Sequence, residues 1–153
     1  MKVVLTYGTF DIFHVGHVRL LRRLKALGDR LIVGLSTDEF NALKGKSALM
    51  RFEDRREVLE AVDAVDLVIP ESSWDQKIDD VREHNVDIFG IGDDWEGKFD
   101  FLKPHCEVVY LSRTHGISSS SIKALTSGLS IENIQQMRDS VEVLRNVLKT
   151  FGD

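Results

Sequence analysis

The sequence predicts an α/β fold built on a parallel sheet of about five strands, with helices on both faces. Five short apolar runs are nearly continuous in Val, Ile and Leu, as strands covered on both faces are. Segments with apolar residues at helical spacing separate most of these runs and predict crossover helices. Polar or glycine-containing turns follow the runs, where such sheets bind ligands. We therefore expect a Rossmann-like, doubly wound sheet.

The first half of the chain alternates between the two patterns. Residues 3–5 form the first predicted strand, and residues 18–27 carry apolar side chains at helical spacing up to Gly28. Residues 31–35 form the second strand, and the polar segment that follows predicts the cap of a short helix. Residues 51–62 predict a further helix.

The alternation continues through the second half. Residues 66–69 predict a third strand that ends at Pro70, and residues 74–84 predict a helix. Residues 86–91 and 107–111 predict the last two strands. Because carboxyl ends of parallel strands meet at one edge, we expect the turns after these strands to converge there.

A last helix is predicted after Gly128, capped by Ser130 and running toward Thr150. Its apolar residues recur at spacings of three and four, which is a short heptad pattern. Two interpretations stay open: self-association through this helix, or packing of the helix on its own domain. The residues of the pattern are Ile134, Met137, Val141, Leu144, Leu148 and Phe151.

The composition limits the classes of function. The chain has 153 residues, enough for one domain with a sizeable core. Its formal net charge of −5 argues against nucleic acid or an acidic membrane as a partner. Cys106 is the single cysteine, which excludes an internal disulfide and favours a reducing, cytoplasmic location. We see no signal peptide, and no apolar run is long enough for membrane insertion.

The turn between the first strand and the first helix carries the chemistry. Two histidines, His14 and His17, lie one helical turn apart at the entrance of the helix, whose N-terminus favours a phosphate. Gly8 and Gly16 are expected to let backbone and ligand approach closely. A metal site is disfavoured because no cysteine or further Glu-His pair lies nearby. A P-loop is excluded because Phe40 occupies the position of its first glycine.

Three segments carry a resemblance to a known family. The run Gly-Thr-Phe-Asp at 8–11 with His-Val-Gly-His at 14–17 resembles the signature of the cytidylyltransferase-type nucleotidyltransferases. Residues 113–120, Arg-Thr-His-Gly-Ile-Ser-Ser-Ser, are similar to the second signature of that family. Residues 92–102 are similar to a segment of its glycerol-3-phosphate branch. The resemblance implies a catalytic domain over 1–129 and a helical extension over 130–153.

The resemblance implies transfer of CMP from CTP to an alcohol phosphate, foremost glycerol 3-phosphate, with release of pyrophosphate. It also implies a homodimer and a Mg²⁺ ion that accompanies CTP, without protein metal ligands. Phosphoethanolamine or phosphocholine are the alternative acceptors. A nucleotide-binding sensor without turnover is a second alternative, and a fragment of an RNA-modifying or tRNA-charging enzyme is a third. The acidic composition weighs against the third.

The same resemblance implies roles for individual residues. It makes His14, His17, Lys46 and Arg113 catalytic. The acceptor is expected to meet Lys44 and Lys77, with Trp74 and Arg55 shaping its pocket. Asp11 is expected to hold the turn, and Asp63 stands where relatives carry arginine. The nucleotide site is expected to comprise Thr9, Phe10, His14, Val15, Gly16, His17, Lys46, Gly92, Asp94, Arg113, Thr114, His115, Gly116, Ile117, Ser118, Ser119 and Ser120.

Overall fold

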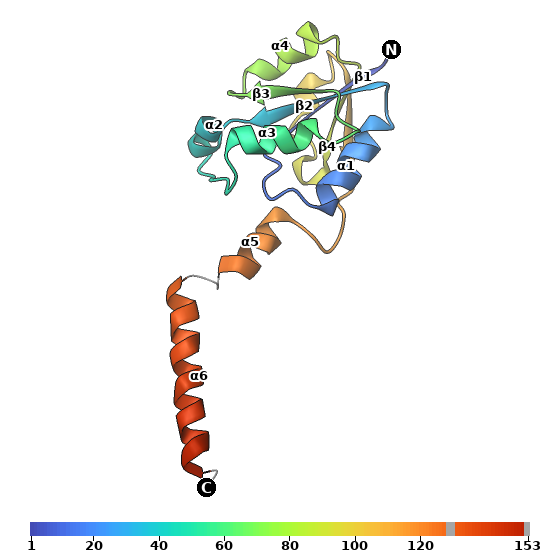
Figure 1. Cartoon of the computed structure of the whole chain (residues 1–153). Coiled ribbons are helices and arrows are strands. Elements are labelled where there is room, and N and C mark those ends of the chain that lie inside the picture. Colours follow the sequence, from blue (N-terminus) through green and yellow to red (C-terminus); the bar gives the residue numbers. More distant parts are fainter. Residues whose placement is uncertain (128–130, 152–153) are drawn as a thin grey trace. The chain divides into compact units, whose positions relative to one another are not determined.

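A computed structural model describes residues 1–127 and 131–151. Its central sheet has five strands in the order β3-β2-β1-β4-β5, and every neighbouring pair is parallel (Figure 1). The predicted doubly wound parallel α/β sheet is thereby confirmed. The strands are β1 (Val3–Gly8), β2 (Arg30–Ser36), β3 (Leu67–Glu71), β4 (Ile88–Gly92) and β5 (Glu107–Leu111).

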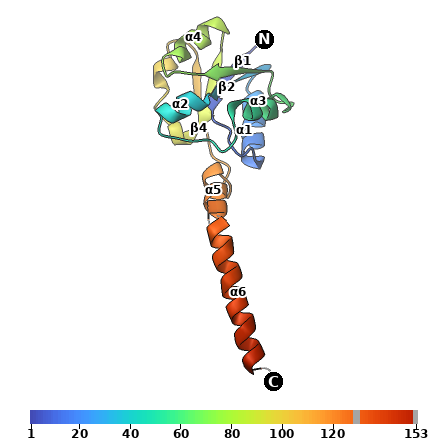
Figure 2. The same cartoon turned by 60° about the vertical axis from the view of Figure 1, so that its left-hand side comes forward.

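The helices cover both faces of the sheet. Helices α1 and α3 lie on one side and α4 lies on the other, as the turned view in Figure 2 shows. Two short 3₁₀ turns, η1 and η2, follow β4. The helical elements are α1 (Val15–Lys25), α2 (Asp38–Leu43), α3 (Phe52–Glu60), α4 (Gln76–Glu83), η1 (Asp93–Trp95), η2 (Asp100–Leu102), α5 (Ser119–Ser127) and α6 (Ile131–Phe151).

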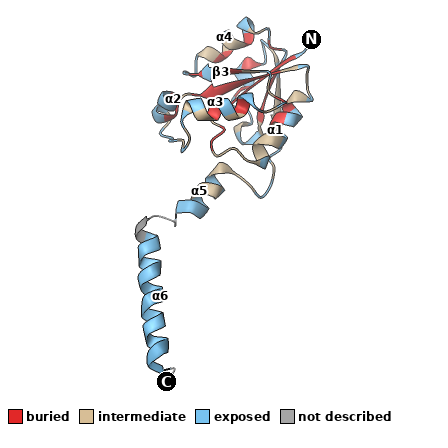
Figure 3. Ribbon diagram, viewed as in Figure 1, coloured by how far each residue is buried: buried red, intermediate tan, exposed pale blue. Residues whose placement is uncertain are grey.

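Two apolar clusters hold these layers together. Successive side chains of a strand point to opposite faces, so Val4 of β1 joins one cluster and Leu5 joins the other. Leu24 of α1 and Leu59 of α3 bury the first face, and Val81 of α4 helps bury the second. The strands are accordingly the most buried part of the molecule (Figure 3).

The strand order places a topological switch beside β1. The chain runs outward from β1 to β3 and then crosses back to β4, on the other side of β1. Ligands of open parallel sheets bind at such a switch, beyond the carboxyl ends of the strands. The turns after β1, β2, β3, β4 and β5 all lie at that edge because every strand points the same way.

Two of the differences between the predicted and the observed element boundaries have a local physical cause. Pro70 continues β3 instead of ending it, because β3 is an edge strand in which a missing N–H is tolerated. The helix predicted from Trp74 begins at Gln76. The side chain of Gln76 accepts hydrogen bonds from the backbone N–H groups of Ser72 and Ser73, which holds the preceding residues in a turn.

The chain divides into two compact units, Met1–Ile117 and Ser118–Asp153. The predicted boundary at 129/130 and the predicted cap at Ser130 lie outside the described residues. In the second unit, Ser118 and Ser121 each accept a hydrogen bond from the backbone N–H of the other, at 3.0 Å, at the start of α5. These two contacts cap the N-terminus of α5. None of the described helices is long and apolar enough to cross a membrane.

Candidate active site

The first helix begins in a mutual arrangement of two histidines. His14 is the N-cap of α1, and its Nδ1 accepts a hydrogen bond from the backbone N–H of Gly16 at 3.0 Å. The backbone N–H of His14 in turn donates to Nδ1 of His17 at 3.3 Å. The two imidazoles stack with ring centroids 3.9 Å apart. This is a capping box in which histidines replace the usual serine and glutamate.

The cap fixes the protonation of both rings. Burial lowers the pKa of His14, and burial together with the neighbouring His14 lowers the pKa of His17 to about 4. Both imidazoles are therefore neutral at pH 7. Each Nδ1 accepts a hydrogen bond, so the proton of each ring lies on Nε2, which becomes a donor. Nε2 of His14 is buried and has no hydrogen-bond partner in the part of the chain that the structure describes.

Aromatic rings lie directly beside the two glycines of this turn. A Cβ on Gly16 would lie 2.7 Å from Cε1 of His14, and a Cβ on Gly8 would lie 2.7 Å from the ring of Phe10. The space in which each Cβ would lie is thus already filled by an aromatic ring, and the approach of a ligand to this backbone stays a prediction. His17 is packed between Phe10 and Phe13, with centroid distances of 5.2 and 5.3 Å.

The turn before α1 is tied to the loop before α3. Phe10 and Ile12 have φ values of 50° and 48°, which are uncommon for residues with side chains. The buried carboxylate of Asp11 lies between them and accepts hydrogen bonds from the backbone N–H groups of Leu49 and Met50 at 2.8 and 3.0 Å. These hydrogen bonds hold the turn in place, which is the role expected for Asp11.

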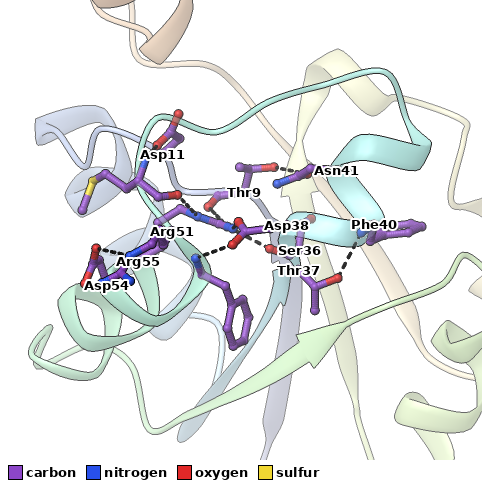
Figure 4. Close-up of polar contacts among 12 residues, drawn as sticks. Thr9, Asp11, Ser36, Thr37, Asp38, Phe40, Asn41, Arg51, Asp54 and Arg55 are labelled. Carbon is purple, nitrogen blue, oxygen red and sulfur yellow. Dashed lines mark hydrogen bonds and ion pairs between the residues drawn. The ribbon is translucent and has the colours of Figure 1, made fainter.

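Arg55 connects four segments beneath the site (Figure 4). Its side chain is fully buried and donates to the backbone carbonyls of Thr9, Ser36 and Met50 at 2.8–3.0 Å. A fourth contact, from Nη2 to the Asp38 carboxylate, measures 2.6 Å. The guanidinium is thus occupied by protein groups, and Arg55 shapes the site by holding its loops.

Two lysines from different loops share one carboxylate. The Nζ of Lys77 lies 2.8 Å from Oε2 of Glu71, and both side chains are buried. The Nζ of Lys44 lies 3.8 Å from Oε1 of Glu71 and 3.3 Å from the hydroxyl of Ser36. Burial lowers the pKa of Lys44, and Lys77 contributes to that shift while Glu71 opposes it. Lys77 is thus buried on the inner face of α4, beside the carboxylate that Lys44 also approaches.

Aromatic rings surround these ammonium groups. The ring of Trp74 lies 4.5 Å from Nζ of Lys77 and packs edge-on against Phe40 at 5.6 Å. Trp74 also approaches Trp95 of η1, with ring centroids 6.3 Å apart. Nζ of the exposed Lys46 lies over Trp95 at 5.6 Å. The loops after β2, β3 and β4 are therefore in contact at one edge of the sheet.

The segment after β5 reaches the same edge. Arg113 forms an ion pair with Asp94 of η1 at 3.2 Å, and both side chains are about half exposed. A Cβ on Gly16 would lie 3.4 Å from the Cγ2 atom of Ile117, so this segment also contacts the histidine turn. The hydroxyls expected to bind nucleotide at 118–120 belong to the second unit, and their role stays a prediction.

Two further residues of the site, Glu71 and Asn41, carry no recognisable signal in the sequence. Glu71 joins both lysines, but a glutamate that ends a strand resembles any polar turn residue. Asn41 is buried in α2, and its Oδ1 accepts a hydrogen bond from the hydroxyl of Thr9 at 3.2 Å. Nδ2 of Asn41 has no partner within residues 1–127 and 131–151. A buried donor without a partner is uncommon and marks a position where a ligand oxygen would be stabilised.

Metal ligands are not gathered at this edge. Among the described residues, no group of three or more His, Cys, Asp or Glu side chains is arranged to hold an ion. The groups that do converge are neutral imidazoles, ammonium groups and one guanidinium. Such a set binds phosphate oxygens and neutralises their charge.

Comparisons with known proteins point to the same chemistry. A family model described as cytidylyltransferase-like matches residues 5–125. The glycerol-3-phosphate cytidylyltransferase of Bacillus spizizenii is 61% identical over 80% of this chain and 95% of its own length. The Staphylococcus aureus protein of the same name is 58% identical over 80% of this chain and 93% of its own. A solved lipopolysaccharide core biosynthesis protein from Thermoplasma volcanium has a TM-score of 0.64 at 27% identity, covering 74% of this chain and 98% of that one.

Proposed function

The chain belongs to the cytidylyltransferase-like family, and we infer from this that it transfers CMP from CTP to glycerol 3-phosphate, giving CDP-glycerol and pyrophosphate. Relatives that are 58–61% identical over nearly their whole length carry that activity in their names. The structural observation that supports it best is the pair of neutral imidazoles, both with Nε2–H donors, at the N-terminus of α1.

In this proposal, an oxygen of glycerol 3-phosphate attacks the α-phosphorus of CTP, and the bond to the β-phosphate oxygen breaks. The acceptor phosphate is already ionised at neutral pH, so the site needs no general base. Catalysis then depends on alignment and on stabilisation of charge at the α-phosphate. We assign that stabilisation to Nε2–H of His14 and His17, which are neutral and fixed in orientation before CTP binds.

The leaving pyrophosphate needs positive charge on its side of the α-phosphorus. We assign this role to Lys46 and Arg113, which are both exposed at the edge of the sheet. Asp94 pairs with Arg113 and orients its guanidinium, for which CTP is expected to compete. The remaining expected nucleotide contacts, from Thr9 and Phe10 to the segment 114–120, stay part of this proposal.

The acceptor site is assigned to Lys44 and Lys77. Their ammonium groups lie near a single buried carboxylate, so the cluster of two lysines and Glu71 carries a net positive charge for the acceptor phosphate. Trp74 borders both lysines and separates them from bulk water. Asn41 supplies a further donor between this cluster and the histidine turn through its unpaired Nδ2.

Enzymes of this kind use a divalent metal ion together with the nucleotide, and we infer that the ion here is Mg²⁺. In the described part of the chain, no three His, Cys, Asp or Glu side chains are arranged to hold an ion, and the carboxylates of Asp94 and Glu71 are paired with cations. The ion is therefore expected to be held by the triphosphate. When bound, it neutralises part of the phosphate charge.

Three further features belong to this proposal. We propose that the enzyme is a homodimer and that it acts in the cytoplasm, where its single cysteine stays reduced. We also propose that residues 1–129 form the catalytic domain and residues 130–153 an extension. The family match ends at residue 125, which agrees with such an extension without fixing its first residue.

A panel of acceptors tests the proposed reaction. Pyrophosphate release is measured with CTP and either glycerol 3-phosphate, phosphocholine or phosphoethanolamine, and the organic product is identified by mass spectrometry. The proposal expects release with glycerol 3-phosphate and formation of CDP-glycerol. Release with phosphocholine alone would contradict the assigned acceptor. Calorimetric binding of CTP without release with any acceptor would identify a sensor.

A further inference from the structure

Helix α6 carries a stripe of apolar residues that have no role in the proposed reaction. Six apolar residues recur at spacings of three and four over 18 residues and so occupy successive a and d positions of a heptad. All six are exposed, from 42% for Ile134 to 83% for Phe151, and the described part of α6 is exposed throughout (Figure 3). We propose that α6 pairs with α6 of a second copy of this chain as a parallel, two-stranded coiled coil.

The side chains in the stripe favour two strands. The a positions are Ile134, Val141 and Leu148, so two of the three are β-branched. The d positions are Met137, Leu144 and Phe151. β-Branched residues at a with unbranched or γ-branched residues at d are typical of parallel dimers, because the a and d side chains then enter the facing holes at different angles.

The flanking charges favour the parallel orientation. Arg138 and Arg145 occupy the two described e positions, while Asn133 and Ser140 occupy the g positions that face them in a parallel pair. In an antiparallel pair, e positions face e positions, and Arg138 would lie opposite the Arg145 of the second copy. In a parallel pair, each arginine faces an uncharged g residue. Repulsion between like charges therefore disfavours the antiparallel arrangement.

The charge of the helix also argues against a lipid surface as the occupant. Residues 131–151 contain three acidic and three basic side chains. Helices that lie on anionic membranes carry an excess of lysine and arginine on the polar face, which this helix lacks. Most of the stability of a protein helix comes from packing of its apolar face, so burial of the stripe against a second copy would stabilise α6.

Disulfide trapping tests both the partner and the orientation. The full chain is prepared with Cys106→Ser and a single new cysteine, either Leu148→Cys in the stripe or Asn146→Cys on the opposite side as the matched control. Under mild oxidation, the proposal expects Leu148→Cys to give a disulfide-linked dimer at least about ten times faster than Asn146→Cys. Unchanged pyrophosphate release shows that both variants are folded.

Two results would overturn the proposal. If neither variant links faster than the other, the stripe does not contact a second copy and packs elsewhere. If Leu148→Cys fails to link with itself but links with Met137→Cys in a mixture, the pair is antiparallel. A second measurement adds Val141→Asp and Leu144→Asp to the Leu148→Cys variant. The two aspartates should abolish the rapid formation of the disulfide-linked dimer. Rapid formation despite both aspartates would also count against the coiled coil.

Discussion

The imidazole of His14 stacks on that of His17 at 3.9 Å while each Nδ1 accepts a backbone hydrogen bond at the start of α1. Both side chains therefore serve as helix caps through one nitrogen and leave the other for a substrate. This double use makes the motif both structural and catalytic. The two functions are separable, because substitutions can preserve the acceptor at Nδ1 and remove the donor at Nε2.

The depressed pKa of His17 predicts a loss of stability in acid. In the unfolded chain this histidine titrates near pH 6.5, and in the folded protein its pKa is about 4. Between these values the unfolded state binds more protons, so the free energy of unfolding falls as the pH drops from 6.5 to 4. The full contribution is about 3 kcal/mol. Urea unfolding at pH 7, 6, 5 and 4.5 measures it.

Because carboxylates also begin to titrate in this range, the matched control is His17→Asn. The pH dependence of unfolding should be less steep in that variant than in the unmodified protein. Identical slopes in the two proteins would show that His17 titrates normally in the folded state.

Gly16→Ala is expected to reduce turnover without unfolding the protein. The new Cβ would lie 2.7 Å from the ring of His14 and must displace it, although alanine itself favours helix formation. We expect kcat to fall about 100-fold, since one oriented donor is lost. Arg19→Ala, on the exposed side of the same helix, is the control and should retain near-normal activity. Full activity of Gly16→Ala would show that the position of the His14 ring is unimportant.

Arg55→Lys is expected to destabilise the fold. A lysine cannot reproduce the planar fork that reaches Thr9, Ser36 and Asp38 together, and it leaves buried carbonyls unpaired. We expect a loss of about 3 kcal/mol in the free energy of unfolding. The neighbouring Arg56→Lys, whose ion pair with Glu60 is half exposed, should cost less than about 0.5 kcal/mol. Chemical denaturation compares the two, and equal effects would contradict the role given to Arg55.

Glu71→Gln should affect the acceptor more than the nucleotide. The change leaves the buried ammonium of Lys77 without its carboxylate and should lower stability by about 3 kcal/mol. In the protein that remains folded, we expect the KM for glycerol 3-phosphate to rise and the KM for CTP to stay nearly constant. Adding Lys77→Met should restore stability without restoring activity. A rise in the KM for CTP of the same size would refute the assignment of Glu71 to the acceptor side.

Much of the fold could be predicted because its signals are local. The continuous apolar runs at 31–35 and 107–111 correspond closely to β2 and β5. The polar segment after β2 does cap a helix, since Thr37 accepts a hydrogen bond from the backbone N–H of Phe40 at 3.1 Å. The prediction that the third strand ends at Pro70 was wrong, because a proline is tolerated in a strand at the edge of a sheet. The order of the elements along the chain does not reveal which strand lies at that edge.

The burial of charged residues could not be predicted, because it depends on partners far away in the chain. Arg55 reaches Thr9, which is 46 residues distant, although both Arg55 and the buried Leu59 lie on the inner face of α3, four residues apart. Lys77 is buried only because Glu71 and the ring of Trp74 fold around it. Helical spacing places Arg55 and Lys77 on the inner faces of their helices, but it does not show which distant groups neutralise their charges.

The most direct test of the central claim compares His14→Asn and His17→Asn with the unmodified protein. The amide oxygen of asparagine can replace Nδ1 as the acceptor in the cap, while the donor at Nε2 is lost. We expect kcat for CDP-glycerol formation to fall at least about 100-fold in each variant, with unfolding temperature and calorimetric affinity for CTP little changed. Turnover within about threefold of the unmodified protein in either variant would contradict the claim that this imidazole stabilises charge at the α-phosphate.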